Sequence, residues 1–176
     1  MKRHSSMQDI TIRRAAVDDL PRILALLTGA RLVTAGVRDH LDTFLVAVEG
    51  DHIAGTAGLE MFGDVALLRS VAVSSPFRGR GLGQRLVHEA LTAARRRGVR
   101  QVALLTEGAT PFFTRLGFQE VDRSRLDHRL FTSKEFADPC CATAVAMKLD
   151  IGEEPDIRPA RMSGPATTSA PGGTHD

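Results

Sequence analysis

A glycine-rich segment between an apolar run and an amphipathic pattern carries the clearest chemistry in this chain. The apolar run 67–73 is followed by Ser-Ser-Pro-Phe and then by Arg-Gly-Arg-Gly-Leu-Gly at 78–83. Backbone amides left unpaired at a helix start, together with the helix dipole, bind phosphate, and glycines let the backbone approach it closely. The segment therefore predicts a pyrophosphate site.

Two common nucleotide-binding motifs do not fit this segment. A Rossmann fingerprint needs Gly-x-Gly-x-x-Gly, but Gln84 follows Gly83, and no acidic residue stands about 20 residues further on. A P-loop needs Gly-Lys-Ser or Gly-Lys-Thr, which the sequence lacks. The pyrophosphate is therefore expected to belong to another kind of ligand.

The segment fits the pattern R/Q-x-x-G-x-G/A, with Arg78, Gly81 and Gly83 placed directly after a strand that ends in Val-Ala-Val. Further along, residues 112–118 read Phe-Phe-Thr-Arg-Leu-Gly-Phe. Both motifs, in this order, resemble the GNAT acetyltransferases, and the resemblance spans roughly residues 10–149.

The resemblance implies acetyl-CoA as cosubstrate and no metal. In that family the fourth strand splays from the fifth, so that its backbone binds pantetheine like an added strand, and the amide matching Val73 polarises the thioester carbonyl. The residues expected to contact the cosubstrate are Val71, Ala72, Val73, Arg78, Gly79, Arg80, Gly81, Leu82, Gly83, Gln84 and Phe113.

The reaction implied is direct attack of the amine of a small substrate on acetyl-CoA in a ternary complex. An alkylammonium must first lose a proton, and Glu60 and Glu107 are the candidate acceptors of it. Arg69 interrupts an apolar strand and is expected to meet an anion, either Glu60 or a substrate carboxylate. The residues assigned to the acceptor substrate are Arg69, Thr106 and His40.

The acid that reprotonates the leaving thiolate is the point at which the sequence departs from the family. Many members have a tyrosine where Phe113 stands, and this chain has no tyrosine. Cys140 and Thr143 are the candidate replacements, although a small buried packing residue is the commoner role of a cysteine. The alternative is that the CoA thiolate, a fairly good leaving group, needs no acid from the protein. The missing tyrosine also favours an alternative, a non-catalytic GNAT-fold module that senses acetyl-CoA or an arsenical.

A closer resemblance is to acetyltransferases associated with bacterial arsenic-resistance operons. It rests on Gly-Leu-Glu at 58–60, Gly-Asp at 63–64, Leu-Leu-Arg-Ser at 67–70, the two phenylalanines at 112–113, and the late residues Glu135, Phe136, Cys140 and 142–144. Adjacent thiols at Cys140 and Cys141 could bind a thiophilic metalloid. An arsenic-resistance context is therefore part of the hypothesis.

The apolar periodicity switches repeatedly along the chain, which predicts an α+β protein. Strands are expected at 10–13, 43–49, 52–61, 65–73, 99–106, 118–122 and 144–149. Helices are expected after Asp18, which could act as the N-cap, within 29–42, from Gly83 to about Ala94 and at 110–116. The GNAT resemblance implies a mixed α/β sandwich: a mostly antiparallel sheet of six to seven strands with one parallel crossover, flanked by about four helices.

Composition bounds the remaining expectations. With 43% hydrophobic and 25% charged residues, the chain predicts one globular domain at 10–150 between a flexible stretch at 1–9 and a disordered Pro/Gly-rich tail at 151–176. The net charge is only +2, and no stacking aromatics accompany the arginines, so we expect no nucleic-acid partner. We expect a cytoplasmic protein without membrane contact, and a homodimer is left open.

Overall fold

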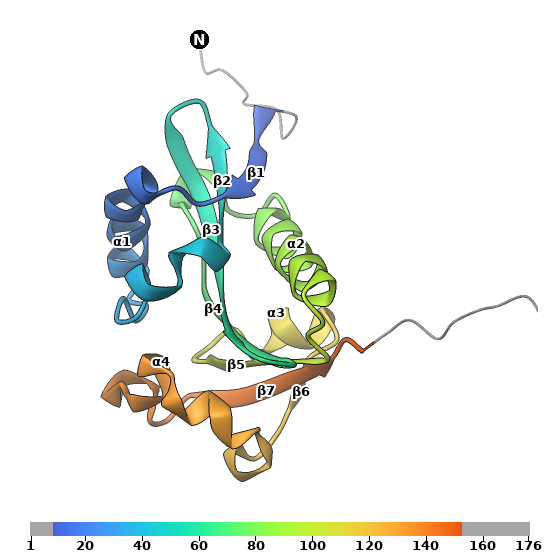
Figure 1. Ribbon diagram of the computed structural model, residues 1–176. Coiled ribbons are helices and arrows are strands. Elements are labelled where there is room, and N and C mark those ends of the chain that lie inside the picture. Colours follow the sequence, from blue (N-terminus) through green and yellow to red (C-terminus); the bar gives the residue numbers. More distant parts are fainter. Residues whose placement is uncertain (1–8, 153–176) are drawn as a thin grey trace, which may run out of the picture.

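The computed structural model describes residues 9–152, in which seven strands form one mixed sheet flanked by helices (Figure 1). The strand order is β1-β2-β3-β4-β5-β7-β6, in which only β4 and β5 are parallel neighbours. The strands are β1 (Thr11–Arg14), β2 (Phe44–Glu49), β3 (His52–Phe62), β4 (Val65–Val73), β5 (Gln101–Thr106), β6 (Gln119–Glu120) and β7 (Val145–Asp150). The expected mixed, mostly antiparallel sheet is confirmed.

Four α-helices and several single-turn 3-10 helices connect the strands of the described chain. The α-helices are α1 (Leu20–Gly29), α2 (Leu82–Arg96), α3 (Thr110–Arg115) and α4 (Lys134–Ala137). The 3-10 helices are η2 (Val17–Asp19), η3 (Arg38–Thr43), η4 (Ser75–Phe77), η5 (Arg123–Arg125), η6 (His128–Thr132) and η7 (Pro139–Cys141). In α2 the buried positions recur at helical spacing, as the sequence pattern predicts.

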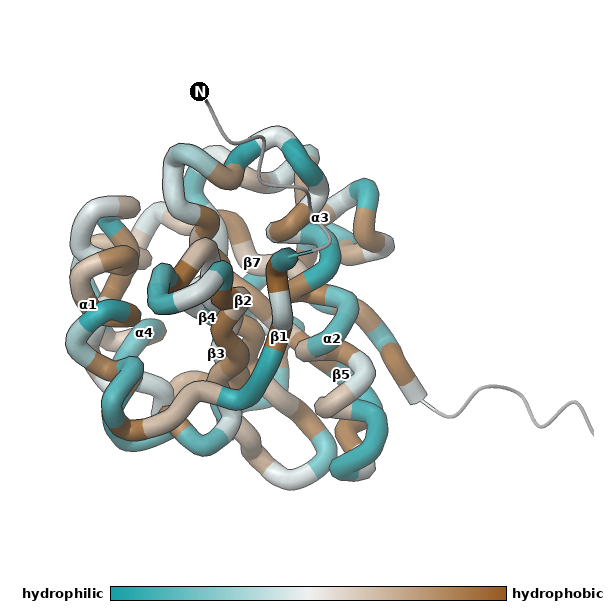
Figure 2. Tube along the Cα trace, turned by 90° about the horizontal axis from the view of Figure 1, so that it is seen from above, coloured by the Kyte–Doolittle hydropathy of each residue, from teal (hydrophilic) through white to brown (hydrophobic). Residues whose placement is uncertain are grey.

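The two faces of the sheet are covered differently. The largest apolar cluster packs α2, including Leu86 and Ala90, against the sheet together with Phe113 and Phe118. The opposite face is covered by α1 along β2 and by the 126–136 segment along β4, β5 and β7. Figure 2 shows the apolar residues gathered along the strands inside the surrounding helices. Two separate segments, α1 and residues 126–136, thus cover the opposite face.

Three local expectations need correction. Asp18 does not cap α1, because the helix begins at Leu20 and the residue at its N-cap position is Asp19, whose Oδ2 accepts the Ala16 N–H at 2.7 Å. The strand expected at 118–122 shortens to β6, because only Gln119 and Glu120 pair with β7. The helix expected within 29–42 is the 3-10 helix η3, kinked at His40.

Most predictions for the two ends of the chain lie outside the described residues. These are the flexible stretch at 1–9, apart from residue 9, and the tail at 151–176, apart from 151–152. Along the described chain, no helix is both long enough and apolar enough to cross a lipid bilayer.

Candidate active site

The two halves of the sheet separate between β4 and β5. Their parallel pairing begins at Val65↔Gln101 and ends at Leu67↔Ala103, although β4 continues to Val73 and β5 to Thr106. In Figure 1, β2 to β4 run upright while β5 and β7 cross the lower part of the molecule. The second half of β4 therefore has a backbone edge that β5 does not cover.

A bulge in β4 marks the start of this open edge. The pairing with β3 shifts register between Thr56 and Gly58, and Ser70 adopts a left-handed conformation with φ 57°. Such a bulge bends the strand and increases its twist. The bulge therefore accompanies the divergence of β4 from β5.

The orientation of Val73 follows from the antiparallel ladder. The Ser74 N–H donates to the Ala54 carbonyl at 2.8 Å. Hydrogen-bonded and non-hydrogen-bonded pairs alternate along such a ladder, so the backbone groups of Val73, which lies opposite Gly55, turn away from β3 toward the open edge. The Val73 carbonyl accepts from Arg78 Nε at 2.9 Å. The Val73 amide is thus directed to the side where β5 has diverged.

The turn that precedes α2 has the form expected of an anion site. Gly79 and Gly81 both have φ 76°, and a Cβ added at either would meet nothing within 4 Å. Gly81 is the N-cap of α2, no side chain caps the helix, and the first helical bond is Arg85 N–H to the Gly81 carbonyl at 3.1 Å. The amides of Leu82, Gly83 and Gln84 precede that bond and are the donors that helix starts offer to anions.

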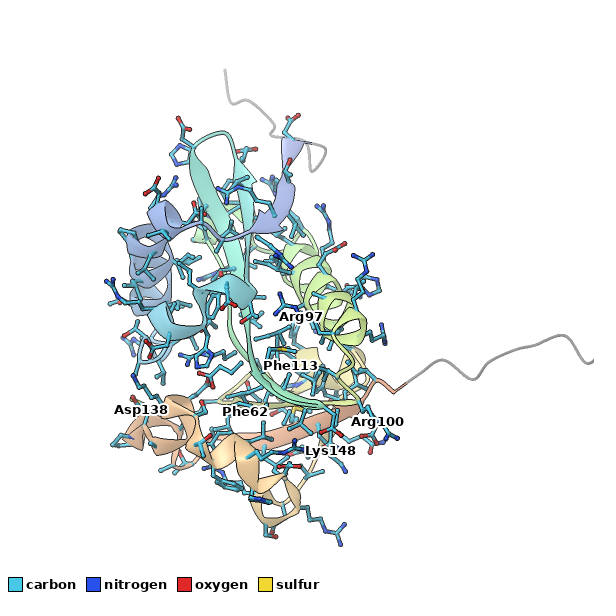
Figure 3. The ribbon with its side chains drawn as sticks, in the orientation of Figure 1. Phe62, Arg97, Arg100, Phe113, Asp138 and Lys148 are labelled. Atoms are coloured by element: carbon cyan, nitrogen blue, oxygen red, sulfur yellow. The ribbon has the colours of Figure 1, made fainter. Side chains whose placement is uncertain are left out.

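Two adjoining cavities follow this edge and turn. One of about 430 Å³ lies over the turn and α3, and a larger one of about 630 Å³ runs between β4 and β5. Both are lined by Val73, Arg78, Gly83 and Phe112. Figure 3 shows Phe113, which also lines the larger cavity, in the interior beside the point where the two halves of the sheet meet. The shape suits a long ligand that enters over the turn and ends between the strands.

A buried ion-pair cluster lies around Arg69, which lines the larger cavity. Its guanidinium donates to Glu60 Oε1 at 3.0 Å, and its Nε lies 3.3 Å from Glu135 Oε2. Further bonds run from Arg69 to the Val33 carbonyl at 3.0 Å and to Ser70 Oγ at 3.2 Å. The expectation that Arg69 meets Glu60 is confirmed, and a second carboxyl group joins the pair.

The cluster continues to the surface through His40. Its Nε2 lies 3.3 Å from Glu60 Oε1, and its side chain is 34% exposed. A Cβ at Gly36 would approach Arg69 and Glu60 to 3.2 and 3.3 Å, so the chain before η3 packs closely over the pair. Above it, Lys134 and Asp39 form an exposed ion pair of 2.9 Å between α4 and η3. The two covers of this sheet face therefore meet over the Arg69 cluster.

The remaining polar lining comes from the ends of β5 and η7. Glu107 Oε1 accepts the hydroxyl of Thr143 at 2.9 Å, and Thr106 is buried. Burial raises the pKa of Cys141 to about 11, and Asp138 raises the pKa of Cys140. Because thiolates form only near or above the thiol pKa, both cysteines carry their protons at neutral pH. They can donate a proton but do not offer thiolates.

The structure brings most of the predicted site residues together. Those that line the two cavities are Arg69, Val71, Ala72, Val73, Arg78, Gly79, Gly81, Leu82, Gly83, Gln84, Thr106, Glu107, Phe113 and Cys140. Three others lie beside them: Arg80 is exposed on the same turn, and Glu60 and His40 lie behind Arg69. Within residues 9–152, no group of three or more His, Cys, Asp or Glu side chains is arranged to hold a metal ion.

Glu135, Cys141 and the 30–33 segment also line the larger cavity. The sequence predicts Cys141 only as a possible metalloid ligand, and it predicts no catalytic role for Glu135. They come from parts of the chain without a clear periodic pattern. The one signal that pointed to Glu135 was Arg69, a charge within an apolar strand that requires anionic partners.

Comparisons with known proteins agree with this geometry. Residues 13–118 match the model of the acetyltransferase (GNAT) family. The amino-acid acetyltransferase of Mycobacterium tuberculosis is 30% identical over 132 residues, which cover 68% of this chain and 74% of that protein. An uncharacterized N-acetyltransferase of Chlorobaculum tepidum is 25% identical over 131 residues, 70% of this chain and 84% of that one.

Among solved structures, a Mycobacterium tuberculosis protein crystallised in complex with CoA has a similar fold. Its TM-score is 0.67 at 23% identity, and the match covers 80% of this chain and 99% of that chain. At this identity the likeness concerns the fold.

Proposed function

Because this chain belongs to the GNAT family, whose members are acetyl-CoA-dependent N-acetyltransferases, we propose that it acetylates the amine of a small molecule by direct attack in a ternary complex. The single observation that carries the proposal is the continuous path from the Arg78–Gly83 turn to the open edge of β4. That path offers amide donors at one end and a cavity of about 630 Å³ at the other.

The residues present fit acetyl-CoA. The open turn with two left-handed glycines can accommodate a pyrophosphate against the start of α2. Val71 and Val73 on the uncovered edge of β4 can bond the pantetheine amides as an added strand would. When bound, acetyl-CoA supplies the activated thioester, and the Val73 amide is our candidate for polarising its carbonyl.

The acceptor is proposed to bind between the 30–33 segment and the 134–144 segment. Both segments line the cavity beside Arg69 and Thr106. A relative acetylates amino acids according to its name, and a small amine of that size suits the space. Glu107 stays a candidate base in this scheme, and Cys140, which keeps its proton, stays the candidate acid.

The proposal is tested by the thermal stabilisation that acetyl-CoA confers on the protein and on two variants of Gly81. At roughly 100 times its dissociation constant the ligand should stabilise the native state by about 2.7 kcal/mol. Gly81→Asp places a carboxylate toward the pyrophosphate and should abolish the gain. Gly81→Asn has nearly the same shape without the charge, and both residues tolerate a positive φ, so it should keep most of it.

The outcome against the proposal would be a wild-type protein that acetyl-CoA does not stabilise, or an aspartate variant stabilised as much as the asparagine variant. A separate assay, release of free thiol from acetyl-CoA in the presence of an amine, measures acetyl transfer itself. Because both variants place a similar side chain at position 81, the difference between them measures the effect of charge and not that of backbone strain.

A second candidate function is a sensor that binds an arsenical without turnover, within the arsenic-resistance context. The observation in its favour is that Cys140 and Cys141 both line the cavity and that the chain has no tyrosine. A sensor should bind arsenite, lose that binding when both cysteines are changed to serine, and release no thiol with any amine. Turnover by the double serine variant at the wild-type rate would exclude the cysteines from both roles.

A further inference from the structure

Glu135 differs from the other acidic residues that could face an incoming amine. Its side chain is 10% exposed, lines the larger cavity, and reaches it from α4 rather than from the strands that hold the thioester path. Its Oε2, like Oε2 of Glu60, is buried and has no hydrogen-bond partner, although the Arg69 Nε lies 3.3 Å away; of these two oxygens, only that of Glu135 belongs to a residue that lines the cavity. A buried carboxyl oxygen without a hydrogen bond is costly, which suggests a partner that arrives with the substrate.

The groups around Glu135 set its pKa close to neutral pH. Burial raises its pKa to about 7, opposed by Arg69 and reinforced by Glu60 and Asp138. The thiol of Cys141, from η7, also faces it. A general base works best when its pKa lies near the operating pH, because it is then ionised yet still basic enough to take a proton.

The other two carboxyl groups of the site are placed less well for this task. Glu60 is fully buried behind Arg69 and does not line either of the two cavities. Glu107 lies on the exposed rim, where its carboxylate accepts a bond from Thr143. Neither combines contact with the cavity and burial as Glu135 does.

Building on the proposed function, we propose that Glu135 is the general base that takes the proton from the acceptor ammonium. The ammonium N–H bond breaks and its proton moves to a Glu135 oxygen, so that the free amine can form a C–N bond with the thioester carbonyl carbon. When the tetrahedral intermediate collapses, the C–S bond breaks, the nitrogen loses its second proton, and the departing sulfur gains one. The product is an amide and free CoA thiol.

Arg69 then acts as a positioning residue. Its NH1, NH2 and Nε donors already bond Glu60, Val33 and Ser70. Its positive charge pairs with two carboxyl groups of the protein and not with a substrate. The cavity beside it therefore favours a cationic head group, the ammonium that the base must deprotonate.

Two isosteric amine pairs test the base without requiring the natural acceptor. The amino groups of ethylamine and β-alanine are protonated at pH 7, whereas those of methoxyamine and aminooxyacetate, in which oxygen replaces the adjacent methylene, are unprotonated. Glu135→Gln should lower kcat/KM for the first of each pair by roughly 10²–10⁴-fold, and for the second by less than about tenfold. A structural defect would lower both equally, and equal losses would overturn the proposal.

Glu120→Gln is the matched control, because Glu120 is exposed on β6 and lines neither cavity of the site. It should leave all four rates unchanged. In the wild type the rate with ethylamine should rise with pH through about 7, where Glu135 ionises. Glu135→Gln should lack that step, and a step retained in Glu135→Gln but lost in Glu60→Gln would assign the base to Glu60 instead.

Titration of the protein labelled with ¹³C in the glutamate carboxyl groups gives a readout that needs no acceptor. One resonance, absent in Glu135→Gln, should titrate near 7; a value near the ordinary glutamate pKa of about 4.3 would overturn the proposal. Stabilisation of Glu135→Gln by acetyl-CoA separates the two hypotheses. If acetyl-CoA stabilises neither the wild type nor Glu135→Gln, the proposed function fails. If it stabilises both fully and Glu135→Gln acetylates ethylamine at the wild-type rate, only the role of Glu135 is overturned.

Discussion

Single residues in this protein show how charge is tolerated inside an apolar sheet. Arg69 stands in the most buried part of β4, where an unpaired charge would cost several kcal/mol. Glu60, Glu135 and the Val33 carbonyl surround it, and these partners come from β3, α4 and the chain after α1. The guanidinium thereby contacts three parts of the chain at the point where the acceptor is proposed to bind.

Asp19 illustrates the same principle at the start of α1, which leads into the cavity segment 30–33. Its carboxylate is buried and contacts Arg13 at 2.7 Å and Arg22 at 3.0 Å. The hydrogen bond from Arg13, partly offset by burial and aided by the Ala16 amide, lowers the pKa of Asp19 to about 2. The depressed pKa means that the native state prefers the ionised form.

We predict that Asp19→Asn lowers the free energy of unfolding by about 2 kcal/mol at pH 7. A depressed carboxyl pKa contributes stability above the unfolded-state value of about 3.9 and loses it as pH falls toward 2. The difference between wild type and variant should therefore shrink between pH 5 and pH 2 in urea denaturation. An equal difference at both pH values would mean that charge is not the cause.

Among the elements, β2 and β3 pack through a close approach of the β3 backbone to a β2 ring. Gly58 in β3 lies against Phe44, and a Cβ at this position would stand 2.3 Å from the ring. Phe44 is fully buried in the cluster beneath α1. Gly58 also borders the register shift that produces the bulge in β4.

We predict that Gly58→Ala destabilises the protein by about 1–3 kcal/mol, because the added methyl overpacks a buried ring. Gly29→Ala is the matched control: it lies at the end of α1, and its Cβ would meet nothing within 4 Å. Alanine there should be neutral or stabilising by up to about 1 kcal/mol. Urea denaturation measures both, and a Gly58→Ala variant as stable as wild type would show that Phe44 can yield.

At the scale of the whole molecule, the divergence of β4 from β5 creates the site. The α2 cluster includes residues of β3, β4, β5 and β7, and so spans both halves of the sheet. On the opposite face α1 packs along β2, and the 126–136 segment packs along β4, β5 and β7. A ligand that inserts between the halves would complete the edge that β4 leaves open. Binding and the packing of the two halves should therefore be coupled.

We predict that acetyl-CoA slows backbone hydrogen exchange most at residues 71–73 and 79–84. At 100 times the dissociation constant, exchange that requires dissociation should slow by up to about 100-fold. The pairing of β1 with β2 lies outside the two cavities and should change little. Protection spread evenly over the sheet, or absent from the turn before α2, would contradict this arrangement.

Local sequence patterns were sufficient to predict the strand, the glycine turn and the helix that follow one another from Val65 to Arg96. These elements are contiguous, and alternation, glycine positions and helical spacing all act between near neighbours. The same local signals predicted the strands at 43–49 and 52–61, which pair as β2 and β3. Local hydrogen bonding and periodicity were sufficient for these parts.

Which acidic residue meets the cavity, and how its pKa shifts there, depends on contacts between segments that are remote in the sequence. Glu135 belongs to a short helix without a periodic pattern, and its raised pKa depends on burial and on Arg69 and Glu60, which lie far away in the chain. Desolvation and charge coupling arise from contacts between remote segments, and such contacts leave no signature in the residues beside Glu135. For the same reason the sequence could suggest Glu60 as a candidate but could not show that it lies behind Arg69.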